Sequence, residues 1–327
     1  MGPSRVGHET YTSGVTAQRS TDGELAHEAP KQQTIRITNG ADPVETMAVL
    51  RQGPRDPQMR VSPGTVMRAM RTVDGPAAVR MRVHGASIDV LAWGPGANAA
   101  MDMVPGLVGL LDEPGGLTPR DAVIAELARR RPGLRLTRTG SVMDALVVSV
   151  LGQKVQGEEA HRAWQGIVMR FGERAPGPLG LWVPPPPEKL ARLPYWAFHA
   201  IGLERRRADV IRAAAAVAPQ LERVAALTHD DGEKRLRSLN GIGPWTAAET
   251  MRLALGDADA VSVGDYHLPR LVCHALAGEP HGTDERMLEL LEPYRGQRAR
   301  VALLIEHGVG MQARRAPRRR LRSIAAY

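Results

Sequence analysis

Residues 239–247 read Leu-Asn-Gly-Ile-Gly-Pro-Trp-Thr-Ala, and this stretch decides how the chain folds. It joins two segments with helical patterns, and Pro244 stands at the start of the second, where a missing N–H costs nothing. Gly241 and Gly243 would let the turn expose backbone N–H groups in front of the positive end of that helix. Such a hairpin can hold a phosphate. An ordinary helix-turn-helix connector would share the Gly-x-Gly spacing.

The hairpin is followed by a lone aspartate in the segment Gly264-Asp265-Tyr266. Hairpin and aspartate together resemble the helix-hairpin-helix/Gly-Pro-Asp superfamily of DNA glycosylases, which remove damaged bases. The sequences Trp-Thr-Ala at 245–247 and Leu-Gly-Gln-Lys-Val at 151–155 are similar to its alkylation-repair branch, the 3-methyladenine DNA glycosylase II type. The resemblance implies a mostly helical α+β fold, in which a small antiparallel sheet domain precedes an all-helical glycosylase domain.

Length, charge and cysteine content narrow the class of protein. A chain of 327 residues is long enough for two or three domains, and its net charge of +8 favours a polyanionic partner. Its single cysteine, Cys273, excludes an internal disulfide and the four-cysteine iron–sulfur cluster of other branches of the superfamily. No apolar run approaches the roughly 20 residues that span a bilayer, and no secretory signal is recognisable. We therefore expect a cytoplasmic protein without a membrane partner.

The amino-terminal third of the chain has strand patterns after a polar start. Residues 1–33 are polar and lack a period, which predicts a disordered tail. Polar and apolar residues then alternate at 34–38, 78–83 and 87–91, and a helix is expected at 97–111. This pattern predicts an antiparallel α+β domain at 34–118 with one solvated sheet face.

Helical patterns dominate the remainder and predict an all-helical glycosylase domain at 119–312. Ser141 with Asp144 forms a plausible capping start for one of these helices. The last segment, 313–327, is a basic tail, with six arginines in the nine positions from 314 to 322. It is either a flexible arm that binds phosphate or a merely solvated tail. The helices are expected at 121–131, 141–151, 157–171, 205–218 and 284–294.

Asp265 occupies the position of the catalytic carboxylate that the resemblance implies. Cleavage of an N-glycosidic bond builds positive charge on the sugar, and a nearby carboxylate stabilises that charge and orients the attacking water. The alternative role of Asp265 is to cap a helix starting near Tyr266. The two roles are compatible, because a cap anchors the carboxylate.

Trp245, Glu249 and Tyr266 are the predicted lining of the pocket for the damaged base. Bifunctional relatives carry a lysine where this chain has Trp245, so the resemblance implies simple hydrolysis that leaves an abasic site. An indole face attracts a cationic, flipped-out purine, although Trp245 could instead pack in the core. Glu249 lies one helical turn later on the same face, or pairs only with Arg252.

The predicted DNA contacts come from two segments. In the first, Asn240 replaces the usual hairpin proline, which asparagine tolerates in turn geometry. In the second, relatives place an apolar wedge where this chain has Lys154, so Val155 could fill the space left by the flipped base, or Lys154 could contact phosphate. The predicted DNA-binding residues are Gly241, Ile242, Gly243, Thr246, Gln153 and Lys154.

These features predict a monofunctional DNA glycosylase that removes alkylated purines, such as 3-methyladenine and 7-methylguanine, from double-stranded DNA in base excision repair. Relatives act as monomers. The alternatives are a non-catalytic protein that binds damaged DNA through the same scaffold, and a glycosylase for oxidised or deaminated bases. We expect no cofactor, because the spacing of His267, Cys273 and His274 matches no usual zinc site. The resemblance leaves open a monovalent cation held by hairpin carbonyls.

Overall fold

The computed structural model describes residues 29–308. The predicted basic tail at 313–327 and most of the predicted amino-terminal tail therefore lie outside the described residues. The first strand begins at Lys31, so residues 31–33 belong to the sheet and not to the predicted tail. Within the described range, none of the helices combines the length and the apolar character that a membrane crossing requires.

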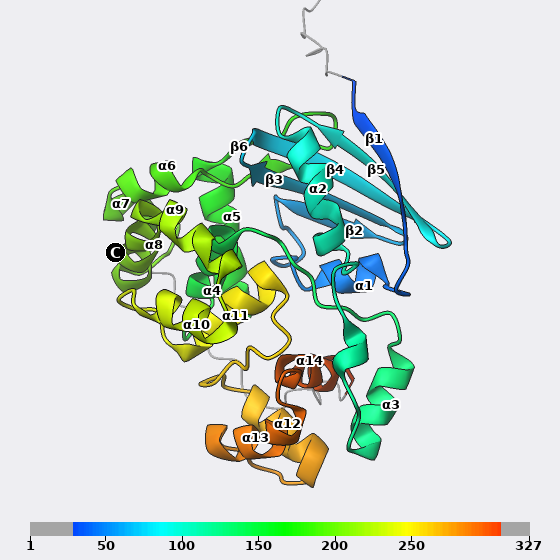
Figure 1. Cartoon of the computed structure of the whole chain (residues 1–327). Helices are drawn as coiled ribbons and strands as arrows, with labels where there is room; N and C mark the ends of the chain where they lie inside the picture. Colours follow the sequence, from blue (N-terminus) through cyan, green and yellow to red (C-terminus); the bar gives the residue numbers. More distant parts are fainter. Residues whose placement is uncertain (1–28, 309–327) are drawn as a thin grey trace, which may run out of the picture.

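A five-stranded antiparallel sheet forms one side of the molecule, with helix α2 lying across one of its faces (Figure 1). The small hairpin β6–β7 covers part of the opposite face and buries Trp93 there, so that face is only partly solvated. The strands and the two helices beside them are β1 (Lys31–Arg36), α1 (Pro43–Ala48), β2 (Met59–Ser62), β3 (Thr65–Thr72), β4 (Gly75–His84), β5 (Ser87–Trp93), α2 (Ala97–Leu107), β6 (Glu173–Arg174) and β7 (Trp182–Val183), and the sheet order is β1-β5-β4-β3-β2.

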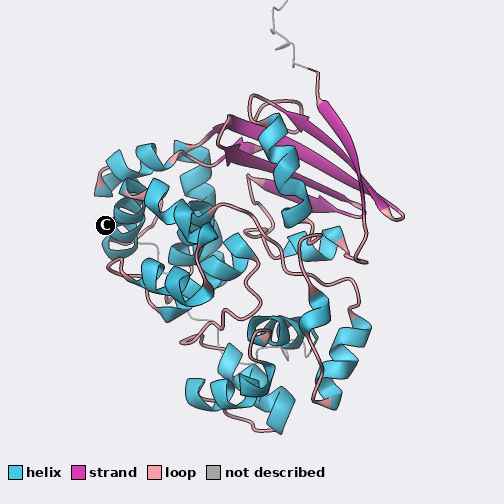
Figure 2. Cartoon of the chain, in the orientation of Figure 1, coloured by secondary structure: helices cyan, strands magenta, loops and turns pink. Residues whose placement is uncertain are grey.

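The rest of the chain is helical, and together with the sheet it confirms the predicted α+β class (Figure 2). The predicted cap of α4 is confirmed, because the Ser141 hydroxyl accepts a hydrogen bond from the Asp144 amide at 3.3 Å. The helices are α3 (Ala122–Arg130), α4 (Val142–Leu151), α5 (Gly157–Phe171), α6 (Pro187–Arg192), α7 (Tyr195–His199), α8 (Arg205–Ala216), α9 (Ala218–Glu222), α10 (His229–Arg237), α11 (Pro244–Leu255), α12 (Leu268–Ala277), α13 (Asp284–Leu291) and α14 (Arg298–Gly308), with 3₁₀ turns η1 (Pro114–Gly116), η2 (Arg223–Ala226) and η3 (Glu292–Tyr294).

The helices pack into two hydrophobic cores. The main core joins the sheet and α2 to the group from α4 to α11. The second core is built by α3, α12, α13 and α14, which lie together at the lower end of the molecule in Figure 1. The segment from 256 to 267 connects α11 in the main core to α12 in the second. Residues on this connection therefore lie at the boundary between the two cores.

Candidate active site

The hairpin at residues 238–243 turns the chain from α10 into α11, and its first glycine has two structural requirements. Gly241 has φ +87°, a conformation that other residues rarely adopt. A Cβ on it would also lie 2.3 Å from Cγ2 of Val210 on α8. Gly243 differs, because its φ of −92° suits any residue and a Cβ there would meet no atom within 4 Å. Gly241 thus shapes the turn, whereas Gly243 leaves open space in front of the backbone.

The hairpin keeps two backbone donors unoccupied at the start of α11. The amides of Gly241 and Gly243 donate no hydrogen bond to any other residue in the described range. The Ile242 amide, in contrast, donates to the carbonyl of Leu239 at 3.1 Å, and its side chain is buried in the main core. Free amides at the positive end of a helix can bind an anion, so the geometry of the two glycines is compatible with the predicted phosphate contact, whereas Ile242 supports the turn.

Gln153 fastens the loop between α4 and α5 to the hairpin. Its side-chain Nε2 donates to the Gly241 carbonyl and to Oγ1 of Thr246, both at 2.9 Å. The Thr246 side chain is buried, so it supports this connection and does not face solvent. The preceding Gly152 lets the Trp245 ring come close, because a Cβ there would lie 3.0 Å from the ring carbon Cη2.

Lys154 stands at the exposed tip of the same loop. It has φ +54° and is the only residue other than glycine with a positive φ between 29 and 308. Val155 is half-buried and packs against the main core. The loop is held from below by the buried Arg207, which donates to the Leu151 carbonyl at 2.9 Å and to Oε1 of Glu159 at 2.7 Å. The structure therefore points Lys154, and not Val155, outward.

Asp265 joins the two cores through three hydrogen bonds. Its Oδ1 accepts from the amides of His267 at 2.7 Å and Leu268 at 2.9 Å, which caps the start of α12. Its Oδ2 accepts from Nε1 of Trp245, on the first turn of α11, at 3.0 Å. The capping role expected for Asp265 is therefore present, and it leaves the carboxylate beside a half-buried indole at the boundary between the cores.

Glu249 does not carry a free charge. Its Oε2 forms an ion pair with Arg252 at 2.6 Å, and its Oε1 accepts from the Ser262 hydroxyl at 2.5 Å. The side chains of Glu249 and Arg252 are only 19% and 17% exposed. This is the alternative arrangement that the sequence left open for Glu249. The negative charge one helical turn beyond Trp245 is therefore neutralised by Arg252.

Tyr266 lies outside the group formed by Trp245 and Asp265. The residue is 89% exposed, and its ring meets that of His267 edge-on, with 4.8 Å between the centroids. An aromatic ring so exposed cannot enclose a base in the structure as it stands. Of the three residues predicted for the pocket, only Trp245 contacts the candidate catalytic carboxylate.

The profile of a family described as HhH-GPD superfamily base excision DNA repair protein matches residues 147–295. This range contains Gln153, the hairpin and Asp265. The chain contains an HhH-GPD domain. Two relatives extend the likeness: the DNA-3-methyladenine glycosylase of Bacillus subtilis (strain 168), 27% identical over 180 residues, and DNA-3-methyladenine glycosylase 2 of Escherichia coli (strain K12), 29% identical over 129 residues.

These alignments cover 54% and 39% of this chain, and 59% and 46% of the respective relatives, so the chain spans about half the length of the curated relatives it matches. Solved structures share the fold over a longer range. A 3-methyladenine DNA-glycosylase from Archaeoglobus fulgidus has a TM-score of 0.71 at 22% identity, covering 84% of this chain and 96% of that one. An 8-oxoguanine glycosylase/lyase from Clostridium acetobutylicum has 0.67 at 12% identity, covering 85% and 96%. The fold of an HhH-GPD domain therefore does not by itself determine which damaged base is removed.

One further carboxylate near the HhH-GPD site was not predicted from the sequence. Glu306, in the last turn of α14, interacts electrostatically with Arg252, Glu249 and Asp265. Burial among protein atoms, followed by the two other carboxylates, raises the pKa of Glu306 to about 7, although Arg252 opposes this. The Glu306 residue is nevertheless exposed to solvent. No local pattern marks it, because it lies far along the chain from Asp265.

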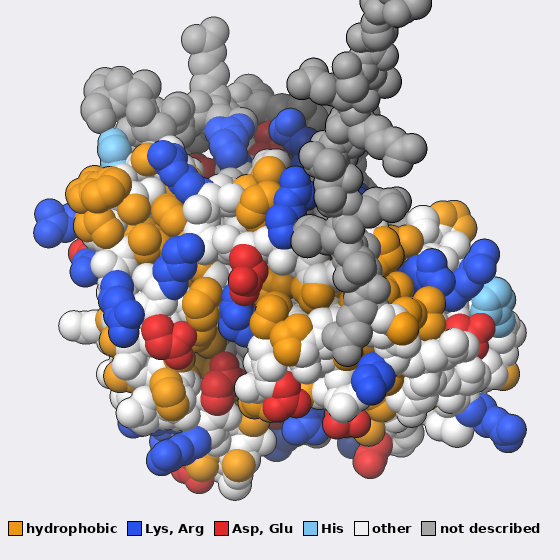
Figure 3. All heavy atoms as spheres, turned by 90° about the horizontal axis from the view of Figure 1, so that it is seen from above, with side chains coloured by type: hydrophobic (Ala, Val, Ile, Leu, Met, Phe, Trp, Pro, Cys, Tyr) orange, Lys and Arg blue, Asp and Glu red, His pale blue; other side chains and the backbone are white. Residues whose placement is uncertain are grey.

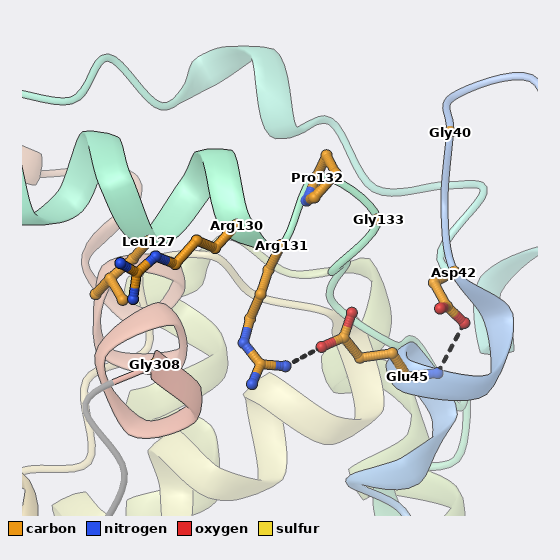
Figure 4. Close-up of a pocket in the computed structure, with 9 residues that line it drawn as sticks. All are labelled: Gly40, Asp42, Glu45, Leu127, Arg130, Arg131, Pro132, Gly133 and Gly308. Atoms are coloured by element: carbon orange, nitrogen blue, oxygen red, sulfur yellow. Dashed lines mark hydrogen bonds and ion pairs between the residues drawn. The ribbon is translucent and has the colours of Figure 1, made fainter.

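A surface pocket of about 710 Å³ lies where α1, the end of α3 and the end of α14 meet (Figure 4). Arg131 closes one side through an ion pair with Glu45 and a 2.8 Å hydrogen bond to the His307 carbonyl. None of the predicted site residues of the HhH-GPD domain lines this pocket. Its lining consists of Gly40, Asp42, Glu45, Leu127, Arg130, Arg131, Pro132, Gly133 and Gly308.

The positive charge is not gathered on the face seen from above, where basic and acidic side chains are interspersed (Figure 3). Many arginines are also paired with neighbouring carboxylates, as Arg252 is with Glu249. Among its described residues, that face of the molecule therefore offers no single broad basic patch for phosphate attraction.

Proposed function

We propose that this protein is a monofunctional DNA glycosylase that hydrolyses the N-glycosidic bond of alkylated purines in double-stranded DNA, and that it acts as a monomer in base excision repair. The observation that carries the proposal is the Trp245–Asp265 hydrogen bond, which fixes a carboxylate beside an aromatic ring at the edge of the hairpin. Chemistry on a base within a duplex requires that the base leave the stack and enter a protein site.

The hairpin supplies the binding half of this function. The free amides of Gly241 and Gly243 donate hydrogen bonds to a DNA phosphate, and Gln153 holds the loop of Lys154 against the same turn. Lys154 projects into solvent on a fixed loop, so it meets the DNA next to the flipped nucleotide. Phosphate contacts hold the duplex in register without reading its sequence, which suits an enzyme that must search for rare lesions.

Asp265 supplies the chemical half. As the bond between the sugar carbon C1′ and the base nitrogen breaks, the bonding electron pair leaves with the base and C1′ becomes cationic. The Asp265 carboxylate stabilises that charge and accepts a proton from the water that attacks C1′. Three donors hold the carboxylate in place, so little reorganisation is needed when the charge develops.

The proposal of simple hydrolysis is supported by the places of the lysines. Strand cleavage by a glycosylase/lyase requires an amine that attacks C1′ and forms a Schiff base. Trp245 occupies the position of that amine in bifunctional relatives. The four lysines of the chain, Lys31, Lys154, Lys189 and Lys234, are all exposed, and none forms a hydrogen bond with Asp265.

Alkylated purines are the proposed substrates because two relatives are named 3-methyladenine glycosylases and because an indole attracts cationic bases. The predicted contribution of Glu249 to this preference is not supported, since Arg252 compensates its charge. The preference for a cationic base is therefore assigned to Trp245 and to the negative charge of Asp265.

The test is to incubate the protein with duplex DNA methylated by a simple alkylating agent and to identify the released bases by chromatography. Release of 3-methyladenine or 7-methylguanine is expected, with strand breaks only after alkali or heat. Borohydride should trap no covalent complex. Binding without release of any base would favour the non-catalytic alternative, and nicking in clean buffer would contradict simple hydrolysis.

A further inference from the structure

The turn that carries Asp265 is held on one side by the second core. The Asp265 amide donates to the Ser262 carbonyl at 3.2 Å, which closes the turn over residues 262–265. Within the turn, Gly264 has φ +90°, a conformation that favours glycine. Its amide donates to both carboxylate oxygens of Asp284, the first residue of α13, at 3.0 and 3.1 Å. The backbone next to the candidate carboxylate is therefore anchored to α13.

Glu249 holds the other side of the same turn from α11, in the main core. Its Oε1 accepts a hydrogen bond from the Ser262 hydroxyl at 2.5 Å, and Ser262 is only 6% exposed. Its Oε2 is paired with Arg252 at 2.6 Å, on the same helix. Hydrogen bonds to an ionised acceptor are shorter and stronger than those between neutral groups. The ion pair thus fixes the Glu249 carboxylate, and the carboxylate fixes Ser262.

Trp245 and Glu249 lie one turn apart on α11, and each holds a different part of the Asp265 turn. The indole Nε1 of Trp245 donates to the Asp265 carboxylate at 3.0 Å. Glu249 instead holds Ser262, whose carbonyl accepts from the Asp265 amide. One helix therefore sets both the place of the backbone and the direction of the carboxylate. The oxygens of Glu249 are occupied by Arg252 and Ser262, so Glu249 acts on Asp265 through the turn.

We propose that Glu249 is a positioning residue, which through Ser262 fixes the turn from which Asp265 reaches the sugar. This inference rests on the proposed function, and it gives Glu249 a role other than the predicted lining of the base pocket. Stabilisation of the cationic sugar depends on the place of the carboxylate, and a displacement of about 1 Å can cost about 100-fold in rate. Loss of the Ser262 contact should therefore slow bond cleavage, while the hairpin keeps the affinity for DNA.

The experiment measures single-turnover release of 7-methylguanine at saturating protein, with DNA affinity and urea unfolding measured on the same variants. Ser262→Ala removes the hydroxyl but keeps the carbonyl that accepts from Asp265, and it leaves the pair of Glu249 and Arg252 intact. It should slow release about 10- to 100-fold, with DNA affinity kept within about threefold. Glu249→Ala should slow release by a similar factor. The double variant should be no slower than the slower single variant, because both changes break the same hydrogen bond.

Glu249→Gln separates the hydrogen bond from the charge. Its amide can still meet the Ser262 hydroxyl through either the oxygen or the NH₂ group, so release should return to within about threefold of the wild-type rate. Arg252 loses its ionic partner in this variant, so the free energy of unfolding should still fall. Glu45→Ala is the matched control, because Glu45 is also a partly buried glutamate paired with an arginine, Arg131 (Figure 4). Glu45→Ala should lower the free energy of unfolding without changing the rate of release.

The positioning role of Glu249 is wrong if Ser262→Ala keeps more than about half of the wild-type rate, or if Glu249→Gln is as slow as Glu249→Ala. It is equally wrong if the two single losses multiply in the double variant, because the two residues would then act independently. An equal loss of rate in Glu45→Ala would assign the effect to general instability. In each of these cases, release of 7-methylguanine by the wild-type protein upholds the proposed function. If the wild-type protein releases no base, the proposed function fails and the positioning role fails with it.

Discussion

Replacing Trp245 with phenylalanine isolates the contact on which the proposed site depends. Phenylalanine keeps an aromatic face for the base but removes the indole N–H that donates to Asp265 Oδ2 at 3.0 Å. A hydrogen bond to a charged acceptor contributes about 1.5–3 kcal/mol. If that contribution is fully expressed when the sugar becomes cationic, Trp245→Phe should slow excision about 10- to 150-fold.

Stability and DNA affinity should change far less than the rate. The ring is half-buried and packs against Gly152, so the smaller phenyl should cost less than the roughly 3 kcal/mol seen when a whole aromatic side chain is removed. The hairpin amides that are proposed to bind phosphate are untouched by this substitution. The assay is single-turnover release of 7-methylguanine at saturating protein, with urea unfolding and a binding titration alongside.

Trp182→Phe is the matched control, because Trp182 lies on β7 beside the sheet and stacks with Arg174, 4.7 Å from its ring centre. It should leave excision unchanged. If Trp245→Phe retains half or more of the wild-type rate with unchanged DNA affinity, the indole does not position Asp265, and the reasoning that links the two residues is refuted.

Three further substitutions test the hairpin and its support. Gly241→Val should unfold the turn, since its side chain would strike Val210 in a backbone conformation that valine avoids; circular dichroism melting would show this, and a stable variant would contradict it. Gly243→Val should keep the melting temperature but weaken binding to every duplex sequence alike. Unchanged DNA affinity would contradict the proposed phosphate contact at Gly243. Burial opposes a charge on His229, but Asp257 at 2.5 Å outweighs it and raises the pKa above 6.5. The contribution of the His229–Asp257 pair to the free energy of unfolding is complete below pH about 6.5 and is lost as the pH rises through the pKa of His229 in the folded protein. Urea unfolding from pH 6 to 9 should therefore show a decline in stability that His229→Gln lacks.

The sequence was sufficient for the parts of the site that depend on local signals. The hairpin glycines, the proline that begins α11 and the capping geometry of Asp265 are encoded within a few residues of one another. Strands β2 and β3 were missed for a physical reason. Arg68 is buried in the middle of β3 beside Ala69 and Met70, so the strand lacks the alternation that marks a sheet with one solvated face.

Contacts that are created only by folding could not be predicted. The sequence placed Glu249 on the face of Trp245, but whether Arg252 would compensate its charge depended on side-chain geometry. Tyr266 follows the proposed catalytic aspartate in sequence, yet the turn directs it to solvent. The electrostatic interaction between Glu306 and Asp265 depends on the packing of α14 against α12 in the second core, which no pattern near Glu306 in the sequence predicts.

The most direct test of the central claim compares wild-type protein with Asp265→Asn in single-turnover release of 7-methylguanine from methylated duplex DNA. Asparagine keeps an oxygen to cap the amides of His267 and Leu268, so the fold and DNA binding should persist. It removes the negative charge that is proposed to stabilise the cationic sugar, so release should fall at least about 100-fold. Retention of more than about a tenth of the wild-type rate, a loss of under about 1.4 kcal/mol, would contradict the assignment of Asp265 as the catalytic carboxylate.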